Sequence, residues 1–130
     1  MLRFRRYFRV AANLLTVLEI IGISAGAHRL WSHRAYKATW QLRTILILFY
    51  SICMQKSAYW WALIHRLHHR HVDTDADPVN SNQGFMFSQL IWITKFPRPE
   101  VYEQSKKIYM SDLHEDKIVM FQHKYVRNTY

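Results

Sequence analysis

The sequence predicts an all-α membrane protein, with one transmembrane helix and a second apolar helix that lies at the interface or re-enters the bilayer. Two observations support this fold class. Apolar residues concentrate in segments 10–27 and 44–64, and basic residues flank the first of them. Half of the residues are hydrophobic, yet the mean hydropathy is −0.22, because hydrophilic stretches offset the apolar ones.

The strong positive charge raises the question of nucleic-acid binding, since the net charge is +9 and the pI about 9.9. The basic residues gather instead at both ends of the first apolar segment, where lysine and arginine contact anionic lipid headgroups. They are Arg3, Arg5, Arg6, Arg9, Arg29, Arg34, Lys37 and Arg43. No nucleic-acid motif is present, so we expect membrane lipid, and no nucleic acid, as the partner of this charge.

Residues 10–27 form the predicted transmembrane helix, which follows a basic segment at residues 1–9 and continues into a histidine-bearing helix. The basic start, apolar middle and small residues at 24–27 also resemble a secretory signal peptide. Asn13 and Glu19 interrupt the apolar run and weaken both interpretations, the signal peptide more. Charge does not decide the orientation, because basic residues flank both ends equally.

The second apolar segment, 44–64, contains neither Gly nor Pro, and its length favours a helix over a strand. Lys56 and Ser57 divide it into an aliphatic half and an aromatic half, and it runs directly into a histidine cluster. Histidines precede and follow this segment. If they bind the same metals, residues 34–64 cannot cross the bilayer just once, so we expect residues 44–60 to be interfacial or re-entrant.

The chain becomes polar beyond about residue 70 and is predicted to be cytosolic surface. Three aspartates between residues 73 and 77 mark an exposed turn. An aromatic stretch at 85–92 is predicted to be interfacial or buried. Ser111 and Asp112 predict the start of a helix that continues through residue 121.

Five of the eight histidines form two tight groups beside the apolar segments. These are His28 and His33, in the spacing H-x-x-x-x-H, and His65, His68 and His69, in the spacing H-x-x-H-H. Positions i, i+3 and i+4 of an α-helix share one face, so the second group can converge on a metal. Positions five apart lie roughly 140° apart on a straight α-helix. Either the helix ends between His28 and His33, or these two ligands serve different ions.

The ligands alone leave the metal open. A structural zinc site usually includes cysteines, whereas imidazole-rich sites also suit iron and copper. The aspartates of the 73–77 turn are possible hydrogen-bond partners of metal-bound histidines, with a solvated acidic turn as the alternative. His71 is either a further ligand or a solvated neighbour, and we expect the latter. We expect His114 and His123 to be interfacial surface residues.

Two motifs, GAHRLWSHRAYK at 26–37 and HRLHHRHVDTDADPVN at 65–80, closely resemble the first and second histidine boxes of the stearoyl-CoA desaturase family. The resemblance covers essentially residues 20–126. It implies an enzyme of the endoplasmic-reticulum membrane with its histidine boxes in the cytosol. In this family two irons activate dioxygen to introduce a cis double bond into a fatty acyl-CoA, and cytochrome b5 supplies the electrons.

The resemblance also implies residue roles. Those that match iron ligands are His28, His33, His65, His68 and His69. Gln55 and Trp61 match residues that line the bent acyl tunnel. Trp61 precedes His65 by one helical turn, which places it on the ligand face. Ordinary helix packing is the alternative for both residues, and it is equally favoured for Gln55.

The chain departs from the family in two respects. It lacks a third histidine box and the first membrane segment, so residues 10–130 are expected to be a partial desaturase domain, truncated at both ends and inactive alone. Residues 63–64 and 96–97 are Leu-Ile and Phe-Pro, where the family has charged pairs that contact CoA. The acyl carrier is therefore open. The alternative functions are a membrane di-iron hydroxylase and an inactive remnant that binds lipid or a full-length partner.

Overall fold

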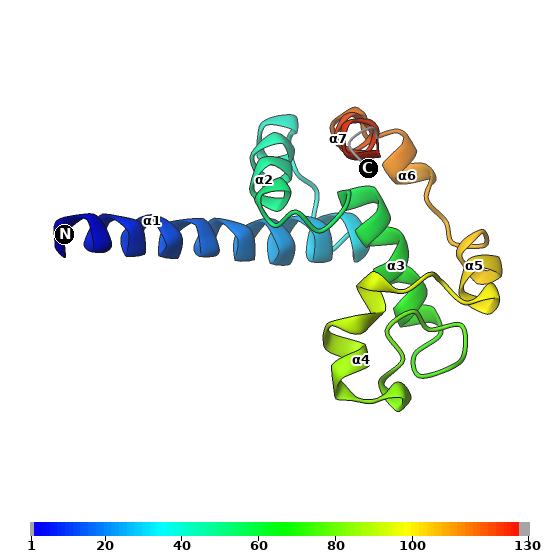
Figure 1. Ribbon diagram of the computed structural model, residues 1–130. Coiled ribbons are helices and arrows are strands. Elements are labelled where there is room, and N and C mark those ends of the chain that lie inside the picture. Colours follow the sequence, from blue (N-terminus) through cyan, green and yellow to red (C-terminus); the bar gives the residue numbers. More distant parts are fainter. Residues whose placement is uncertain (1, 128–130) are drawn as a thin grey trace.

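The computed structural model describes residues 2–127, which form helices and contain no β-strand (Figure 1). The elements are α1 (Leu2–Ile21), η1 (Gly22–Ser32), α2 (Trp40–Ile52), α3 (Ala58–Arg70), η2 (Ser81–Gln83), α4 (Phe85–Gln89), η3 (Ile91–Thr94), α5 (Pro99–Ser105), α6 (Ser111–His114) and α7 (Lys117–Arg127). Of these, η1 is a π-helix, and η2 and η3 are short 3₁₀-helices. The predicted all-α class is confirmed.

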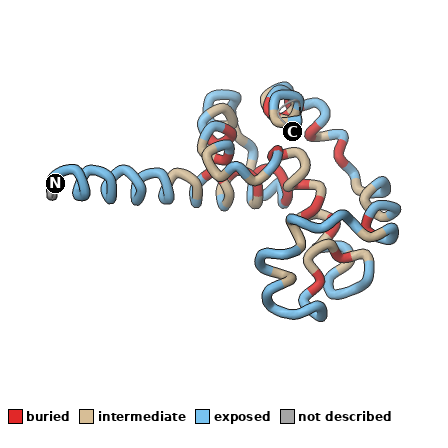
Figure 2. Tube along the Cα trace, in the orientation of Figure 1, coloured by how far each residue is buried: buried red, intermediate tan, exposed pale blue. Residues whose placement is uncertain are grey.

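The first two elements join into one continuous helix, α1–η1, which is longer than the predicted segment 10–27 and includes the basic residues before it. Residues 3–17 are exposed, and this part of α1 extends away from the rest of the molecule (Figures 1 and 2). The stretch Arg3–Ser32 is long and apolar enough to cross a membrane. Only 17% of its most apolar 18-residue segment is buried inside the protein.

Helix α2 packs antiparallel to the end of the α1–η1 helix. Gly22 makes the close approach possible, because a Cβ atom there would lie 2.3 Å from the backbone nitrogen of Tyr50. One turn nearer the N-terminus of α1, the Cys53 thiol lies 3.7 Å from the Glu19 carbonyl oxygen. The 13 residues of α2 rise about 20 Å, which is less than the roughly 30 Å thickness of a bilayer's hydrocarbon core.

The prediction of one helix through residues 44–64 is wrong, because residues 53–57 separate α2 from α3. Met54 and Lys56 adopt positive φ angles of 52° and 57°, which end the helix. The Ser57 side chain accepts a hydrogen bond from the Trp60 backbone N–H at 3.1 Å and so caps α3. The break reverses the chain and lets the C-terminal half of α3 reach the end of η1.

The predicted helix from Ser111 through residue 121 is also interrupted. Helix α6 ends at His114, and the buried Asp116 begins α7 by accepting hydrogen bonds from the backbone N–H groups of Ile118 and Val119. Its other carboxylate oxygen lies 2.9 Å from Nη1 of Arg43, which ties α7 to α2. A capping residue inside an apolar pattern therefore starts a second helix.

The hydrophobic core lies where η1, α2, α3, α6 and α7 meet. Its buried residues are Ala27, Leu30, Trp31, Leu46, Ile47, Tyr50, Ala58, Ala62, Met110, Leu113 and Val119. The aromatic stretch at 85–92 lies outside this core. Phe85 and Leu90 are 76% and 60% exposed, while Trp92 stacks on Trp60 of α3 at 5.9 Å. The core fixes η1 against α3 and leaves their C-terminal ends at the surface.

Candidate metal centre

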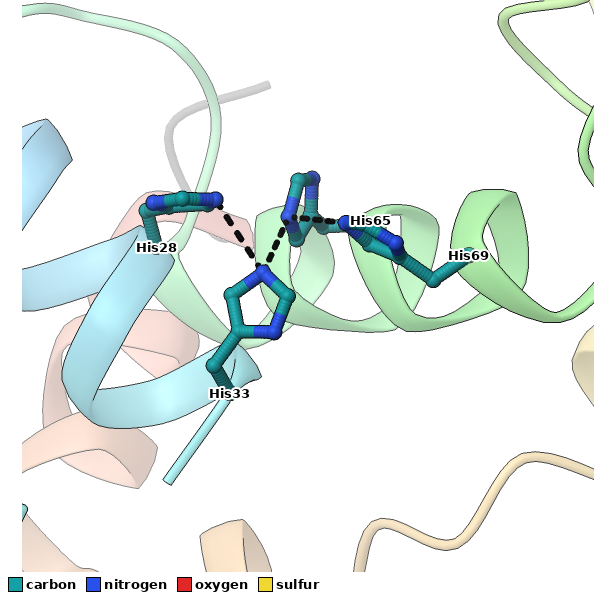
Figure 3. A group of neighbouring side chains, drawn as sticks. All are labelled: His28, His33, His65 and His69. Carbon is teal, nitrogen blue, oxygen red and sulfur yellow. Dashed lines mark hydrogen bonds between the residues drawn. The ribbon is translucent and has the colours of Figure 1, made fainter. Parts of the chain in front are cut away.

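Four histidines from two elements meet at the C-terminal ends of η1 and α3 (Figure 3). Nε2 of His33 lies 3.1 Å from Nε2 of His28 and 3.0 Å from Nε2 of His65. Nε2 of His69 lies 3.1 Å from Nε2 of His65. One ring nitrogen from each residue falls within 4.8 Å of all the others. We call these residues the four-histidine cluster.

The π-helical winding of η1 brings His28 and His33 together. In a π-helix each N–H bonds to the carbonyl five residues earlier, and the backbone N–H of His33 donates to the His28 carbonyl at 3.0 Å. Residues five apart therefore stack one turn above the other. The expectation of a 140° separation assumed an α-helix and is wrong here. The helix does end just before His33, but both imidazoles face one point.

Two of the three histidines in the second group follow the predicted geometry. His65 and His69 lie four residues apart on α3 and present their rings to the same side. Because α3 begins at Ala58, the ligands occupy its last two turns, next to the end of η1. His28 and His33, which lie one turn apart, thus face His65 and His69, which lie one turn apart on α3.

The cluster favours neutral imidazoles. Burial, followed by the charges of His69, His28, His33 and His68, lowers the pKa of His65 to about 3. Burial and neighbouring imidazoles also lower the pKa of His33 and of His69. At neutral pH these rings carry no charge, and the neutral ring is the form that binds metal.

The nitrogen positions fit a metal ion. A neutral imidazole has one N–H and one lone pair, so neighbouring rings in this row can hydrogen-bond to one another without a metal, and each can instead turn a lone pair toward a shared ion. An imidazole nitrogen lies about 2.0–2.1 Å from zinc, so two nitrogens on one such ion lie roughly 3 Å apart. The Nε2 separations of 3.0–3.1 Å match that spacing. An all-imidazole set suits iron, copper or zinc.

His68 stands apart from the four-histidine cluster. Its Nδ1 lies 2.9 and 3.0 Å from the two carboxylate oxygens of Asp77, which is fully buried. A carboxylate accepts hydrogen bonds, so Nδ1 carries the proton and Nε2 keeps its lone pair for a ligand. The expected histidine–aspartate contact is confirmed for this one aspartate. Asp73 binds Ser81 and Asp75 contacts Arg98.

The two residues matched to the acyl tunnel occupy different places. The Trp61 ring stacks on His65 at 4.7 Å with an interplanar angle of 18°, so it lies on the ligand face as predicted. Gln55 lies in the connection between α2 and α3, where its carbonyl oxygen accepts a hydrogen bond from the Tyr50 hydroxyl at 2.7 Å. A tunnel-lining role for both residues stays a prediction.

The three remaining histidines have other surroundings. His114 Nε2 lies 3.1 Å from the Tyr59 hydroxyl, and His123 Nδ1 lies 2.7 Å from the Ser57 hydroxyl. Both therefore contact the N-terminal end of α3, where His114 is exposed as predicted and His123 is half-buried. His71 ends α3, and its Nε2 is buried without a hydrogen-bond partner within residues 2–127, contrary to the solvated position expected.

Sequence reasoning missed two residues near the cluster. Arg66 lies inside the second box, but its guanidinium points to Asp112, and its Nη2 lies 2.7 Å from Oδ2 of that residue. Asp112 was interpreted as a helix start, yet Met110 precedes α6 and no side chain caps it. A charged residue between two ligands was the only signal in the sequence, and the partner 46 residues away could not be inferred from it.

Comparison with known proteins agrees with the geometry. Residues 7–127 match the fatty acid desaturase family. The chain is 49% identical over 116 residues to an acyl-CoA Delta-9 desaturase of Acheta domesticus, covering 89% of this chain and 32% of the relative. It is 47% identical over 116 residues to an acyl-CoA Delta(11) desaturase of Choristoneura rosaceana, covering 89% and 35%.

A vertebrate relative matches equally well. The chain is 46% identical over 121 residues to stearoyl-CoA desaturase 2 of Mus musculus, covering 93% of this chain and 34% of the relative. The chain thus spans about one third of the length of the curated relatives it matches. The match extends over both histidine boxes and nearly the whole sequence, and the chain therefore belongs to the fatty acid desaturase family.

Proposed function

We propose that this chain is the histidine-box region of an acyl-CoA desaturase, which introduces a cis double bond into a fatty acyl chain in a dioxygen-dependent reaction. One observation carries the proposal: ring nitrogens of His28, His33, His65 and His69 lie within 4.8 Å of one another. The relatives named above are acyl-CoA desaturases, so a fatty acyl-CoA is the proposed substrate and cytochrome b5 the proposed electron donor.

The proposed cofactor is a di-iron centre. The four-histidine cluster would hold one iron, and Nε2 of His68, left free by the Asp77 contact, would serve a second. Iron bound there would activate dioxygen, the oxidant that removes two hydrogens from the acyl chain and is itself reduced to water with two electrons from the donor. The Trp61 ring covers one face of His65 and would keep water from the metal on that side.

The proposed membrane placement follows from helix lengths. The α1–η1 helix would cross the bilayer of the endoplasmic reticulum, while α2 would enter the bilayer and leave on the same side, because its 13 residues are too few to span it. Both histidine boxes would then face one side, which by resemblance to the family would be the cytosol. After replacement of Cys53, cysteines at Lys37 and Val72 should both be labelled from the cytosolic side. Labelling from opposite sides contradicts this placement.

A cavity beside α3 bears on the identity of the acyl carrier. A cavity of about 770 Å³ is lined by Trp60, Ile64, Trp92 and Phe96, with Lys56 and Arg98 among its charged residues. Its lining is mainly apolar where the family has charged CoA contacts. Three basic residues, Lys56, Lys95 and Arg98, line the cavity and suit an anionic carrier, and we propose that CoA binds with fewer ion pairs here than in other members of the family.

A chimera tests the proposed function directly. Residues 7–127 would replace the matching region of the Acheta domesticus Delta-9 desaturase, and the product would be expressed in desaturase-deficient cells supplied with saturated fatty acid. Formation of a monounsaturated acyl chain, lost with His65→Ala, supports the proposal. A hydroxylated product would identify a hydroxylase instead. No oxidised product, with normal expression and iron content, would contradict catalysis by this region.

A further inference from the structure

The guanidinium of Arg66 joins three segments that are distant in sequence. It donates from Nη2 to the Trp31 carbonyl at 2.5 Å and from Nε to the Ser32 carbonyl at 3.3 Å. It donates from Nη1 to the Tyr109 carbonyl at 2.6 Å, and its two terminal nitrogens bind the two carboxylate oxygens of Asp112 at 2.9 and 2.7 Å. The Arg66 side chain is only 10% exposed.

These contacts meet a need of the π-helix. The last carbonyls of a helix lack partners within it, and Arg66 binds the final two carbonyls of η1, directly before His33. A guanidinium offers five donors in a rigid planar fork. It can therefore bind a carboxylate through two nitrogens and helix carbonyls at the same time, which the single ammonium of lysine cannot do.

A second arginine binds the same carboxylate. Nε of Arg34 lies 3.0 Å from Oδ2 of Asp112. Partial burial raises the pKa of Asp112, but hydrogen bonding and charge from Arg66, and charge from Arg34, lower it overall. Arg34 has a φ of 53°, a conformation that few residues other than glycine adopt.

The two arginines have equivalent positions in the two boxes. Arg34 directly follows His33, and Arg66 directly follows His65. His33 and His65 are the pair whose Nε2 atoms lie 3.0 Å apart across the two helices. A single carboxylate thus links the residues next to the two histidines that connect η1 with α3.

We propose that Arg34, Arg66 and Asp112 form a positioning triad, which sets the separation of His33 and His65 and thereby the metal affinity of the site. The inference rests on the proposed function, since it requires that the four-histidine cluster binds metal. The three residues act through the backbone next to the ligands and need not touch the metal themselves.

The chain provides a matched control. Arg43 and Asp116 form another partly buried ion pair, with Nη1 of Arg43 2.9 Å from Oδ2 of Asp116 and the aspartate side chain 7% exposed. This pair joins α2 to α7, and in the described part of the chain none of the hydrogen bonds of Arg43 reaches a histidine. Arg43→Met therefore removes an arginine–aspartate pair without disturbing the two boxes.

Cobalt(II) binding to the purified 130-residue chain in detergent tests the triad, with affinity from calorimetry and ligand geometry from the visible absorption spectrum. Asp112→Asn and Arg66→Met should weaken binding by about 10- to 100-fold and shift the absorption bands. Arg66→Lys should restore only part of the affinity, and Arg43→Met should leave affinity and spectrum unchanged. Arg34→Met provides a further variant if Arg66→Met does not fold.

The outcomes separate the two proposals. If cobalt binds equally to wild type and His65→Ala, the metal site itself is wrong, and the proposed function fails with it. If His65→Ala abolishes binding while folded Asp112→Asn and Arg34→Met keep wild-type affinity and spectrum, the triad is overturned and the metal site stands. Equal weakening by Arg43→Met would also overturn the triad, because the effect would then be general loss of stability.

Discussion

The two ends of α3 hold histidines in opposite surroundings. At its C-terminal end His65 and His69 face other imidazoles, with nitrogens 3.0–3.1 Å apart. At its N-terminal end His123 and His114 each face a hydroxyl group, on Ser57 and Tyr59. A hydroxyl both donates and accepts, so it satisfies an imidazole without any ion. Four imidazoles that converge on one point can instead offer their lone pairs to a cation. The partner of each ring nitrogen, more than the number of histidines, therefore separates a metal site from a structural contact.

His65→Ala tests this difference between the two ends of α3 most directly, and we expect it to have the largest effect. The His65 ring lies between His33 and His69 and contacts both. Its loss should remove the bound metal almost completely. Iron per protein after expression of the chimera, measured by mass spectrometry, checks this, with His123→Ala as the control. Normal iron in the His65→Ala chimera would mean that the two ends of α3 do not differ in function.

His68→Ala should have the next largest effect. If His68 serves a second ion, the chimera should lose about half of its iron and all desaturation. Asp77→Asn keeps the shape of the carboxylate but removes its charge, and it should weaken metal binding by about 10- to 100-fold. Full iron content in His68→Ala would restrict the metal site to the four-histidine cluster.

Acid should destabilise the metal-free protein through the C-terminal end of α3. The pKa of His65 falls from 6.5 to about 3 on folding, so between these values the unfolded chain binds a proton that the folded chain does not. Stability is therefore full above pH 6.5 and falls as the pH drops toward 3. Thermal melts of the metal-free protein at pH 7 and pH 5 should show this loss, and His65→Leu should show less of it. Identical losses would contradict the pKa difference.

The smallest effects should come from the N-terminal end of α3. His123→Ala removes the hydrogen bond to the Ser57 hydroxyl and should lower the free energy of unfolding by about 1 kcal/mol. His114→Ala should cost less, because this residue is exposed. Denaturant unfolding measures both, and cobalt affinity should stay at the wild-type value. Loss of metal in either variant would show that the hydroxyl-paired histidines also belong to the metal site.

The sequence was most informative where local periodicity decided the structure. The spacing of His65 and His69 predicted their shared face, and Trp61 followed from the same α-helical turn. The α1–η1 helix was recognisable from its apolar residues, although its ends were not. The family resemblance, later confirmed, implied that the histidines are iron ligands, a role that periodicity alone could not assign and that stays a prediction.

Features that depend on non-local contacts could not be predicted. The break at 53–57 occurs in residues without Gly or Pro, and it depends on positive φ angles at Met54 and Lys56. Asp116 interrupts a helical pattern by capping α7, and Arg43, far away in sequence, binds its other carboxylate oxygen. The contact of Arg66 with Asp112 also joins distant segments. The spacing of residues along the chain predicts neither these backbone angles nor the two arginine–aspartate pairs.

The π-helical winding of η1 has a consequence for how ligand motifs are aligned. H-x-x-x-x-H at 28–33 and H-x-x-x-H at 65–69 differ by one residue, yet each pair lies one turn apart on its own helix. Motifs of this kind are equivalent when they are counted in turns, and they look unrelated when they are counted in residues. A one-residue deletion between His28 and His33 would then be absorbed by rewinding η1 as an α-helix, so the metal-binding geometry can outlast a change in motif length.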